Sequence, residues 1–234
     1  HLKSYAIHTA ILFFSRSASE ESQCKSFSKN DRANSKISRK LIKHSKEEIK
    51  NTNLPVFQFS SKAQSGENFS ERFSNAITSV FDKGFENVIA IGNDCPLLDS
   101  NDIISAYKLL LAGNNVLGPS TDGGIYLLGI KKSEFDIDIF QKLKWQESTL
   151  FLDIQKYFQN EGSKVCLLAE KQDIDKEADL LSLFRSYSQL NIVVALKEIY
   201  LENPILRINH QLEQNSCHTF LESLGMRGPP FNVV

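Results

Sequence analysis

The sequence has few glycines, and none of them falls in the first 65 residues. The 234-residue chain contains 11 glycines, fewer than the roughly 7% typical of globular proteins, and the first is Gly66. Phosphate loops of the Walker and Rossmann kinds need closely spaced glycines after an early strand. Neither kind of loop can therefore lie in the N-terminal quarter of the chain.

Cysteine pairs, long apolar runs and a strong net charge are also absent. The four cysteines (Cys24, Cys95, Cys166 and Cys217) form no CxxC pair, which argues against a zinc site or a disulfide scaffold. No stretch approaches the roughly 20 apolar residues that span a bilayer. The net charge of -1 excludes a general basic surface for nucleic acid. These absences predict a cytoplasmic protein that binds neither membrane nor nucleic acid.

Short apolar runs alternate with stripes of apolar residues at helical spacing over residues 1–187. The runs predict strands at 9–14, 55–60, 88–94, 115–120, 125–130 and 164–170. The stripes predict helices at 36–50, 68–83, about 103–111, 150–158 and 176–187, with glycine ending several of them. Such alternation is typical of an α/β domain with a mostly parallel sheet and helices on both faces.

The character of the sequence changes at about residue 188. Apolar residues at helical spacing predict a helix over 192–200, which breaks at Asn203 and Pro204. They also predict a second helix up to Gly225. We therefore predict a domain over 1–187 and a helical C-terminal extension over 188–234. This apolar extension could serve a homodimer.

The segment IGNDCPLLDSNDI at 91–103 places Asp94 just after a predicted buried strand. Ligands of open α/β sheets bind at the carboxyl ends of the strands. A carboxylate there can hold a divalent cation, because hard cations prefer oxygen ligands. An equally good alternative is that Asp94 only caps the turn.

The segment LGPSTDGGIYLLGI at 117–130 places Asp122, Gly123 and Gly124 between two apolar strands. The two glycines permit a close backbone approach to a ligand. On its own, however, Asp-Gly between apolar runs favours a simple hairpin turn.

The segment QDIDKEADL at 172–180 contains Asp173 and Asp175, which flank Ile174. In an extended segment both carboxylates point to the same side, so they could share one metal ion. Alternatively, Asp175 is a suitable N-cap for a helix that starts at Lys176.

Together these segments resemble the rSAM/selenodomain-associated transferases, a family of glycosyltransferase type with a GT-A-like, Rossmann-like three-layer fold. The match covers roughly residues 9–187. It is carried by QSGENFSERF (64–73), VIAIGNDCPLL (88–98), VLGPSTDGGIYLLGI (116–130), Trp145 in KLKWQES, and QDIDKEADL (172–180).

The resemblance implies a transferase that uses a nucleotide or nucleotide sugar, a small-molecule acceptor and Mg²⁺ or Mn²⁺. It implies Asp94 and Asp175, or Asp173, as metal ligands. It also implies that Asp122 acts catalytically and that Gly123 and Gly124 line the acceptor side. Trp145 either packs between a helix and the sheet or lines the acceptor pocket.

The chain departs from the family after its first strand. Family members usually have a loop like F-[AS]-K-x-P-x-x-G-x-x-K-T-R-L, whereas this chain has FSRSASEESQCKSFSKN at 14–30. Phe14 and Arg16 fit the pattern, the proline and glycine are missing, and Lys25 is displaced by one place. Arg16 and Lys25 could still bind donor phosphates through their side chains, or the segment could be a solvated loop.

The sequence thus predicts a metal-dependent glycosyltransferase, with two alternatives left open. One is a nucleotidyltransferase that acts on a nucleoside triphosphate and a small phosphorylated acceptor. The other is a catalytically inactive homologue that serves as a binding module. An open polar cleft beside Asp94 would favour an enzyme, and a collapsed 15–35 segment would favour the module.

Overall fold

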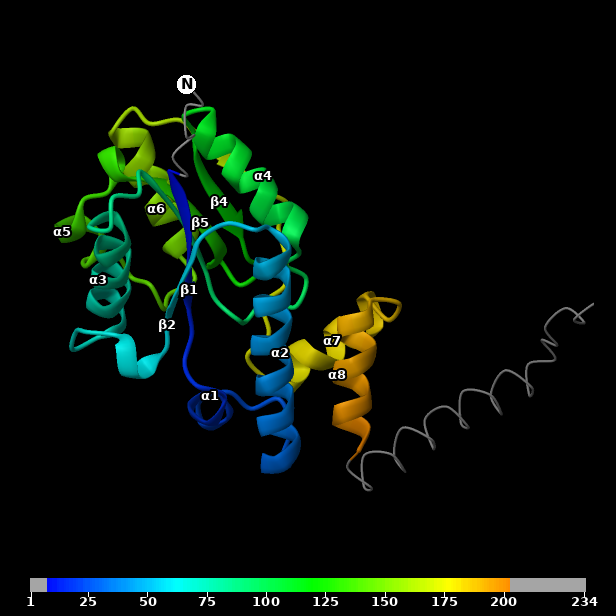
Figure 1. Cartoon of the computed structure of the whole chain (residues 1–234). Coiled ribbons are helices and arrows are strands. Elements are labelled where there is room, and N and C mark those ends of the chain that lie inside the picture. Colours follow the sequence, from blue (N-terminus) through cyan, green and yellow to red (C-terminus); the bar gives the residue numbers. More distant parts are fainter. Residues whose placement is uncertain (1–7, 203–234) are drawn as a thin grey trace, which may run out of the picture.

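The computed structural model describes residues 8–202, which form an α/β structure around one mixed sheet (Figure 1). The strands of this six-stranded sheet are β1 (Thr9–Phe14), β2 (Val56–Phe59), β3 (Asn87–Ile91), β4 (Asn115–Pro119), β5 (Ile125–Lys131) and β6 (Val165–Leu167). Their order is β2-β1-β3-β5-β4-β6. Strand β5 runs antiparallel to β3 and β4, and the other pairs are parallel. The predicted mostly parallel sheet is confirmed.

Helices connect the strands and cover both faces of the sheet. They are α1 (Ala18–Cys24), α2 (Asp31–Asn51), α3 (Phe69–Phe81), α4 (Ser100–Leu111), α5 (Ile137–Phe140), α6 (Leu150–Asn160), α7 (Glu177–Ser186) and α8 (Asn191–Leu201). Two short 3₁₀ turns lie at Ser61–Ala63 and Lys132–Glu134. None of the helices within residues 8–202 is both long and apolar enough to cross a membrane.

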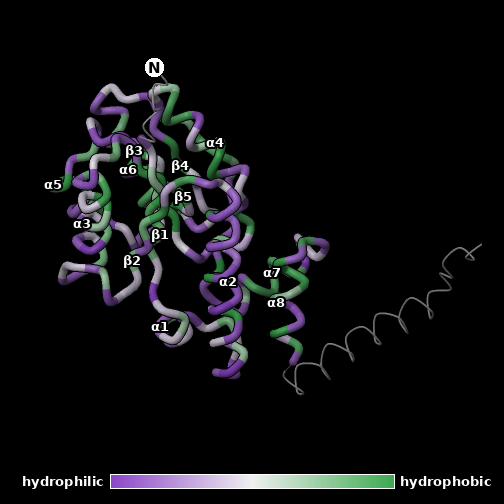
Figure 2. The backbone as a smooth tube through the Cα atoms, viewed as in Figure 1, coloured by the Kyte–Doolittle hydropathy of each residue, from purple (hydrophilic) through white to green (hydrophobic). Residues whose placement is uncertain are grey.

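Alternate residues of β1 point to opposite faces of the sheet and enter separate apolar clusters. Leu12 and Phe14 pack with α3, α5 and α6, whereas Ile11 and Phe13 pack with α4 and the end of α2. This alternation is the ordinary period of a strand, and both faces are buried because helices cover both. Figure 2 shows hydrophobic residues along the strands and a mostly hydrophilic α2.

Glycines end three of the helices as the sequence predicts. Gly84, Gly113 and Gly162 follow α3, α4 and α6 with φ values of 92°, 86° and 66°. Glycine adopts this left-handed conformation without the steric cost that a Cβ would add.

The third apolar cluster joins α8 to the rest of the structure. Leu196 of α8 packs with Leu41 of α2 and Leu183 of α7. The predicted helix over 192–200 is therefore confirmed. The boundary predicted between 187 and 188 stays a prediction, and the second helix predicted up to Gly225 lies outside the described residues.

Candidate functional site

A cavity of about 470 Å³ opens at the carboxyl end of the sheet. The segments that follow four of the five parallel strands, β1, β3, β4 and β6, contribute to its lining through Arg16, Asp94, Asp122 and Asp173 respectively. Such strand ends are where open α/β sheets bind ligands. The apolar lining of the cavity includes the aromatic side chains of Phe14, Phe69, Phe73 and Trp145.

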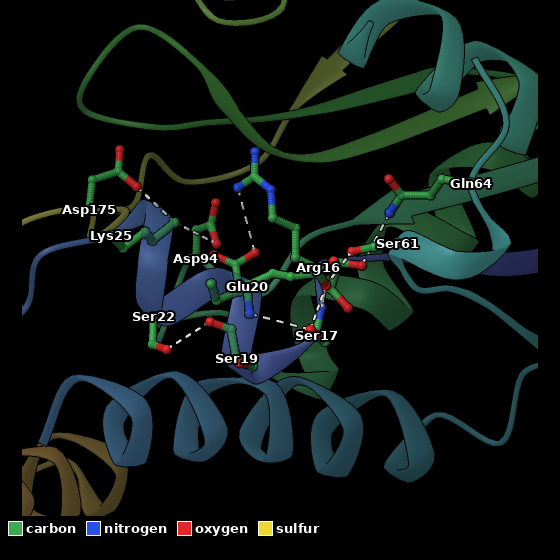
Figure 3. A network of polar contacts seen from close by, with 12 residues as sticks. Arg16, Ser17, Ser19, Glu20, Ser22, Lys25, Ser61, Gln64, Asp94 and Asp175 are labelled. Atoms are coloured by element: carbon green, nitrogen blue, oxygen red, sulfur yellow. Dashed lines mark hydrogen bonds and ion pairs between the residues drawn. The ribbon is translucent and has the colours of Figure 1, made fainter. Parts of the chain in front are cut away.

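The segment after β1 is folded rather than an open loop, because α1 lies there. Ser17 caps α1, and Ser17 and Glu20 form a reciprocal capping box. Glu20 Oε2 also accepts a hydrogen bond from Ser61 Oγ at 2.6 Å. The bonds from Ser17 and then Ser61 lower the pKa of Glu20 to about 2. These contacts, drawn in Figure 3, hold α1 against the segment that contains Ser61.

Lys25, which directly follows α1, lies between two of the predicted metal ligands. Its Nζ is 2.7 Å from Asp94 Oδ1 and 2.8 Å from Asp175 Oδ1 (Figure 3). Burial alone would lower the pKa of the Lys25 ammonium, but the charges of Asp94 and Asp175 outweigh burial and raise it above its ordinary value. Lys25 is therefore charged at neutral pH and is engaged with carboxylates.

Backbone hydrogen bonds join the three segments that contain Lys25, Asp94 and Asp175. The Ile174 N–H donates to the Asp94 carbonyl at 3.0 Å, and the Ser26 N–H donates to the Asp175 carbonyl at 3.1 Å. The N-cap of α7 is Lys176, so the structural alternative that made Asp175 an N-cap is wrong. Asp175 instead pairs with Lys25.

Glu21 and Asp173, which also line the cavity, have carboxyl groups with raised pKa values. Burial, followed by the charge of Asp94, raises the pKa of Glu21 above its ordinary value. Burial, followed by the charges of Asp94 and Asp122, raises the pKa of Asp173 to about 7. Asp173 Oδ1 is buried and has no hydrogen-bond partner within residues 8–202. Asp173 thus holds its proton far more readily than an exposed aspartate.

The Asp-Gly-Gly turn joins β4 and β5, so the hairpin expected from its sequence is confirmed. Asp122 Oδ1 accepts hydrogen bonds from Ser120 Oγ at 2.5 Å and from the Gly124 N–H at 3.0 Å. Asp122 and Gly124 line the cavity. Gly123 is not among the lining residues; its Cα faces the backbone of Ser148.

Trp145 combines a packing role with a place on the cavity wall. Its Nε1–H donates to the Phe140 carbonyl at 2.7 Å, and its ring contacts the rings of Phe69 and Phe73. Trp145 therefore packs against the core, and it also lines the cavity.

Several lining residues were not assigned to the site from the sequence, and three of them have polar side chains that could meet a ligand. These residues are Glu21, Gln64 and Arg72. Arg72 donates to the Glu67 carbonyl at 3.2 Å, and Arg16 Nη1 lies 3.9 Å from Glu21 Oε1. The usable signal was QSGENFSERF, which contains both Gln64 and Arg72.

The predicted Mg²⁺ or Mn²⁺ does not fit between Asp94 and Asp175 as these residues are arranged. A bridging cation would lie about 2.0–2.6 Å from one oxygen of each, in the space that Lys25 Nζ occupies. Within residues 8–202, no group of three or more His, Cys, Asp or Glu side chains is arranged to hold a metal ion.

Comparison with known proteins supports the fold. Residues 34–147, slightly less than half of the chain, match the family model described as "Uncharacterized protein conserved in bacteria (DUF2064)". A solved structure from Desulfovibrio desulfuricans G20, described as a "putative nucleotide-diphospho-sugar transferase", has a TM-score of 0.72 with 21% sequence identity. The match covers 82% of this chain and 94% of that chain. The expected GT-A-like α/β fold is thereby confirmed.

Other solved structures resemble the chain more weakly. Rv0371C from Mycobacterium tuberculosis H37Rv, solved in complex with manganese, has a TM-score of 0.43 and 12% identity, covering 76% of this chain and 99% of that chain. A cytidylyltransferase from Leptospira borgpetersenii serovar Hardjo-bovis has a TM-score of 0.39 and 16% identity, covering 85% and 95%. No curated protein matches the chain by sequence.

Proposed function

We propose that this protein is a transferase that binds a nucleotide-activated sugar and a small-molecule acceptor in the 470 Å³ cavity, and that it transfers the glycosyl group. The observation that carries this proposal is that four parallel strands direct charged residues into one cavity of a GT-A-like fold. The cavity combines guanidinium groups, carboxylates and an aromatic wall. A sugar linked to a nucleoside diphosphate needs partners of all three kinds.

The donor phosphates would bind beside Arg16 and Arg72. Guanidinium groups present several N–H donors in a plane, which suits phosphate oxygens. Within the described residues, Arg16 has one ion pair, 3.9 Å long, with Glu21, and Arg72 has no ion pair, although it donates one hydrogen bond to the Glu67 carbonyl. Both therefore have N–H donors to offer a ligand.

The acceptor would bind in the same cavity beside Asp122, Gly124 and Trp145. A carboxylate there can orient the attacking hydroxyl and accept its proton as the bond to the sugar forms. The nucleoside diphosphate then leaves with the electrons of the broken glycosidic bond. Electrostatic stabilisation of that leaving group by nearby cations is a usual source of catalysis.

The direct test is calorimetry with UDP-, GDP- and CDP-sugars and nucleoside triphosphates, in EDTA and in Mn²⁺. We expect saturable binding of at least one nucleotide class. If no nucleotide binds under either condition, the protein is not this transferase, and the binding-module alternative gains support.

The product released in a transfer assay separates the two enzymatic alternatives. Glycosyl transfer releases a nucleotide from a nucleotide sugar, whereas nucleotidyl transfer releases pyrophosphate from a nucleoside triphosphate. We expect release of the nucleotide.

Replacing Arg16 or Arg72 with alanine is expected to weaken nucleotide binding by about tenfold or more, because each charge-assisted hydrogen bond contributes about 1.5–3 kcal/mol. The matched control is Arg185→Ala, which removes an exposed arginine of α7 outside the cavity. Calorimetry of the three variants measures the effect. Equal affinities in all three would exclude the proposed donor side.

A further inference from the structure

Oxygen atoms of three residues lie close to the Lys25 ammonium, as oxygen ligands lie around a bound metal ion. Besides Asp94 and Asp175, it donates to the carbonyl of Ile174 at 3.4 Å. The Lys25 ammonium thus has two carboxylate oxygens at ion-pair distance and one carbonyl oxygen as a hydrogen-bond acceptor. The Lys25 side chain is only 8% exposed, although the Asp94 and Asp175 side chains are 42% and 61% exposed. The cation is thus more enclosed than its two carboxylates.

The backbone of Lys25 is held in place from both sides. Its N–H donates to the Glu21 carbonyl at 2.9 Å, and its carbonyl accepts from Asn34 Nδ2 at 2.6 Å. The following residue, Ser26, bonds to the Asp175 backbone. The Lys25 backbone is therefore fixed by contacts with α1, α2 and the segment after β6. These contacts hold the side chain close to its partners.

The position and charge of Lys25 compete directly with a divalent ion. Its Nζ is within 2.8 Å of one oxygen of each carboxylate. A bridging Mn²⁺ would need nearly the same point in space, and its charge would repel the ammonium. The two cations cannot both occupy the gap between Asp94 and Asp175.

We propose that Lys25 is a tethered cation that takes the place of a divalent metal ion between Asp94 and Asp175. It neutralises these carboxylates from within the chain and leaves the cavity able to accept an anionic ligand without a metal at this position. The N-terminal segment departs from its family pattern, and we connect this departure with the replacement of a divalent metal ion by the Lys25 ammonium. Arg16 and Arg72, rather than Lys25, then bind the phosphates.

Mn²⁺ titration of the full chain tests this substitution, with paramagnetic resonance or calorimetry as the readout. The wild type is compared with Lys25→Ala, with Lys43→Ala as a control on the exposed face of α2, and with the double variant Lys25→Ala/Asp94→Asn. We expect Lys25→Ala to bind Mn²⁺ at least about tenfold more tightly than wild type, a gain of about 1.4 kcal/mol or more. The gain should be absent in Lys43→Ala and lost in the double variant.

Two results would overturn the proposal. One is Mn²⁺ binding by Lys25→Ala that is no tighter than binding by the wild type; the other is a gain that persists in the double variant Lys25→Ala/Asp94→Asn. If Lys25→Ala does not fold, Lys25→Met keeps the aliphatic stem and is used in the same titration. Because Mn²⁺ alone is the probe, this titration tests the role of Lys25 separately from the proposed function. A negative result in the Mn²⁺ titration does not change the outcome of the nucleotide calorimetry, and a negative result in the calorimetry does not change the outcome of the titration.

Discussion

Replacing Gly123 with alanine is expected to destabilise the fold by about 3 kcal/mol or more. Gly123 has a φ of 89°, and a Cβ at this position would lie 1.9 Å from the Ser148 carbonyl oxygen. The Gly123 N–H donates to the Ser120 carbonyl, and its own carbonyl accepts from the Phe151 N–H, each at 3.0 Å. Backbone contacts surround the residue on several sides, so no flexible side chain can move away to relieve the clash.

The matched control is Gly162→Ala. Gly162 also has a positive φ, at 66°, but a Cβ there would meet nothing within 4 Å. The left-handed conformation alone should cost about 1–2 kcal/mol. Urea denaturation of both variants gives the difference in the free energy of unfolding. Equal losses in the two would mean that the turn does not pack against Ser148 as described.

Replacing Asp173 with asparagine is expected to flatten the pH dependence of stability. The pKa of Asp173 is raised to about 7 in the folded chain, mainly by burial and then by the charges of Asp94 and Asp122. Between about pH 4 and pH 7 the native state keeps a proton that the unfolded chain releases. The free energy of unfolding of the wild type therefore falls as pH rises through this range, by up to about 4 kcal/mol from this group.

Asparagine has nearly the shape of the protonated carboxyl group and never ionises. At about pH 8 the Asp173→Asn variant should therefore be more stable than wild type, and the gap should close towards about pH 4. Asp82→Asn, which changes an exposed aspartate after α3, serves as the control. Urea denaturation across this range measures both. Parallel pH profiles for wild type and Asp173→Asn would contradict the assignment.

Strong local patterns in the sequence predicted most of the elements. The apolar run at 9–14 became β1 with the same bounds, and the helical stripe over 68–83 became α3. These predictions succeeded because the period of a buried strand or amphipathic helix is visible within a few turns of chain. The Asp-Gly-Gly hairpin was likewise recognisable from its turn residues.

Helix α1 was missed because it has little apolar periodicity. Its residues read ASEESQC, and the first signal of a helix is the spacing of Ser17 and Glu20, which is that of a capping box. Reading the segment as a possible loop left no reason to place Glu21 in the cavity.

The partner of Lys25 could not be predicted from the sequence. Lys25 is 149 residues away from Ile174, whose carbonyl it contacts, and no local pattern specifies such a pair. The family pattern pointed instead to phosphate as the partner, because lysines of that loop were expected on the donor side. Only the three-dimensional arrangement brings the ammonium between Asp94 and Asp175.

The central claim, that Lys25 is the cation between Asp94 and Asp175, is tested most directly by a crystal structure grown with MnCl₂ and measured at the manganese absorption edge. We predict no anomalous peak between these two carboxylates, and density for the Lys25 ammonium there instead. A manganese peak bridging Asp94 and Asp175, with the Lys25 side chain displaced from them, would contradict the account.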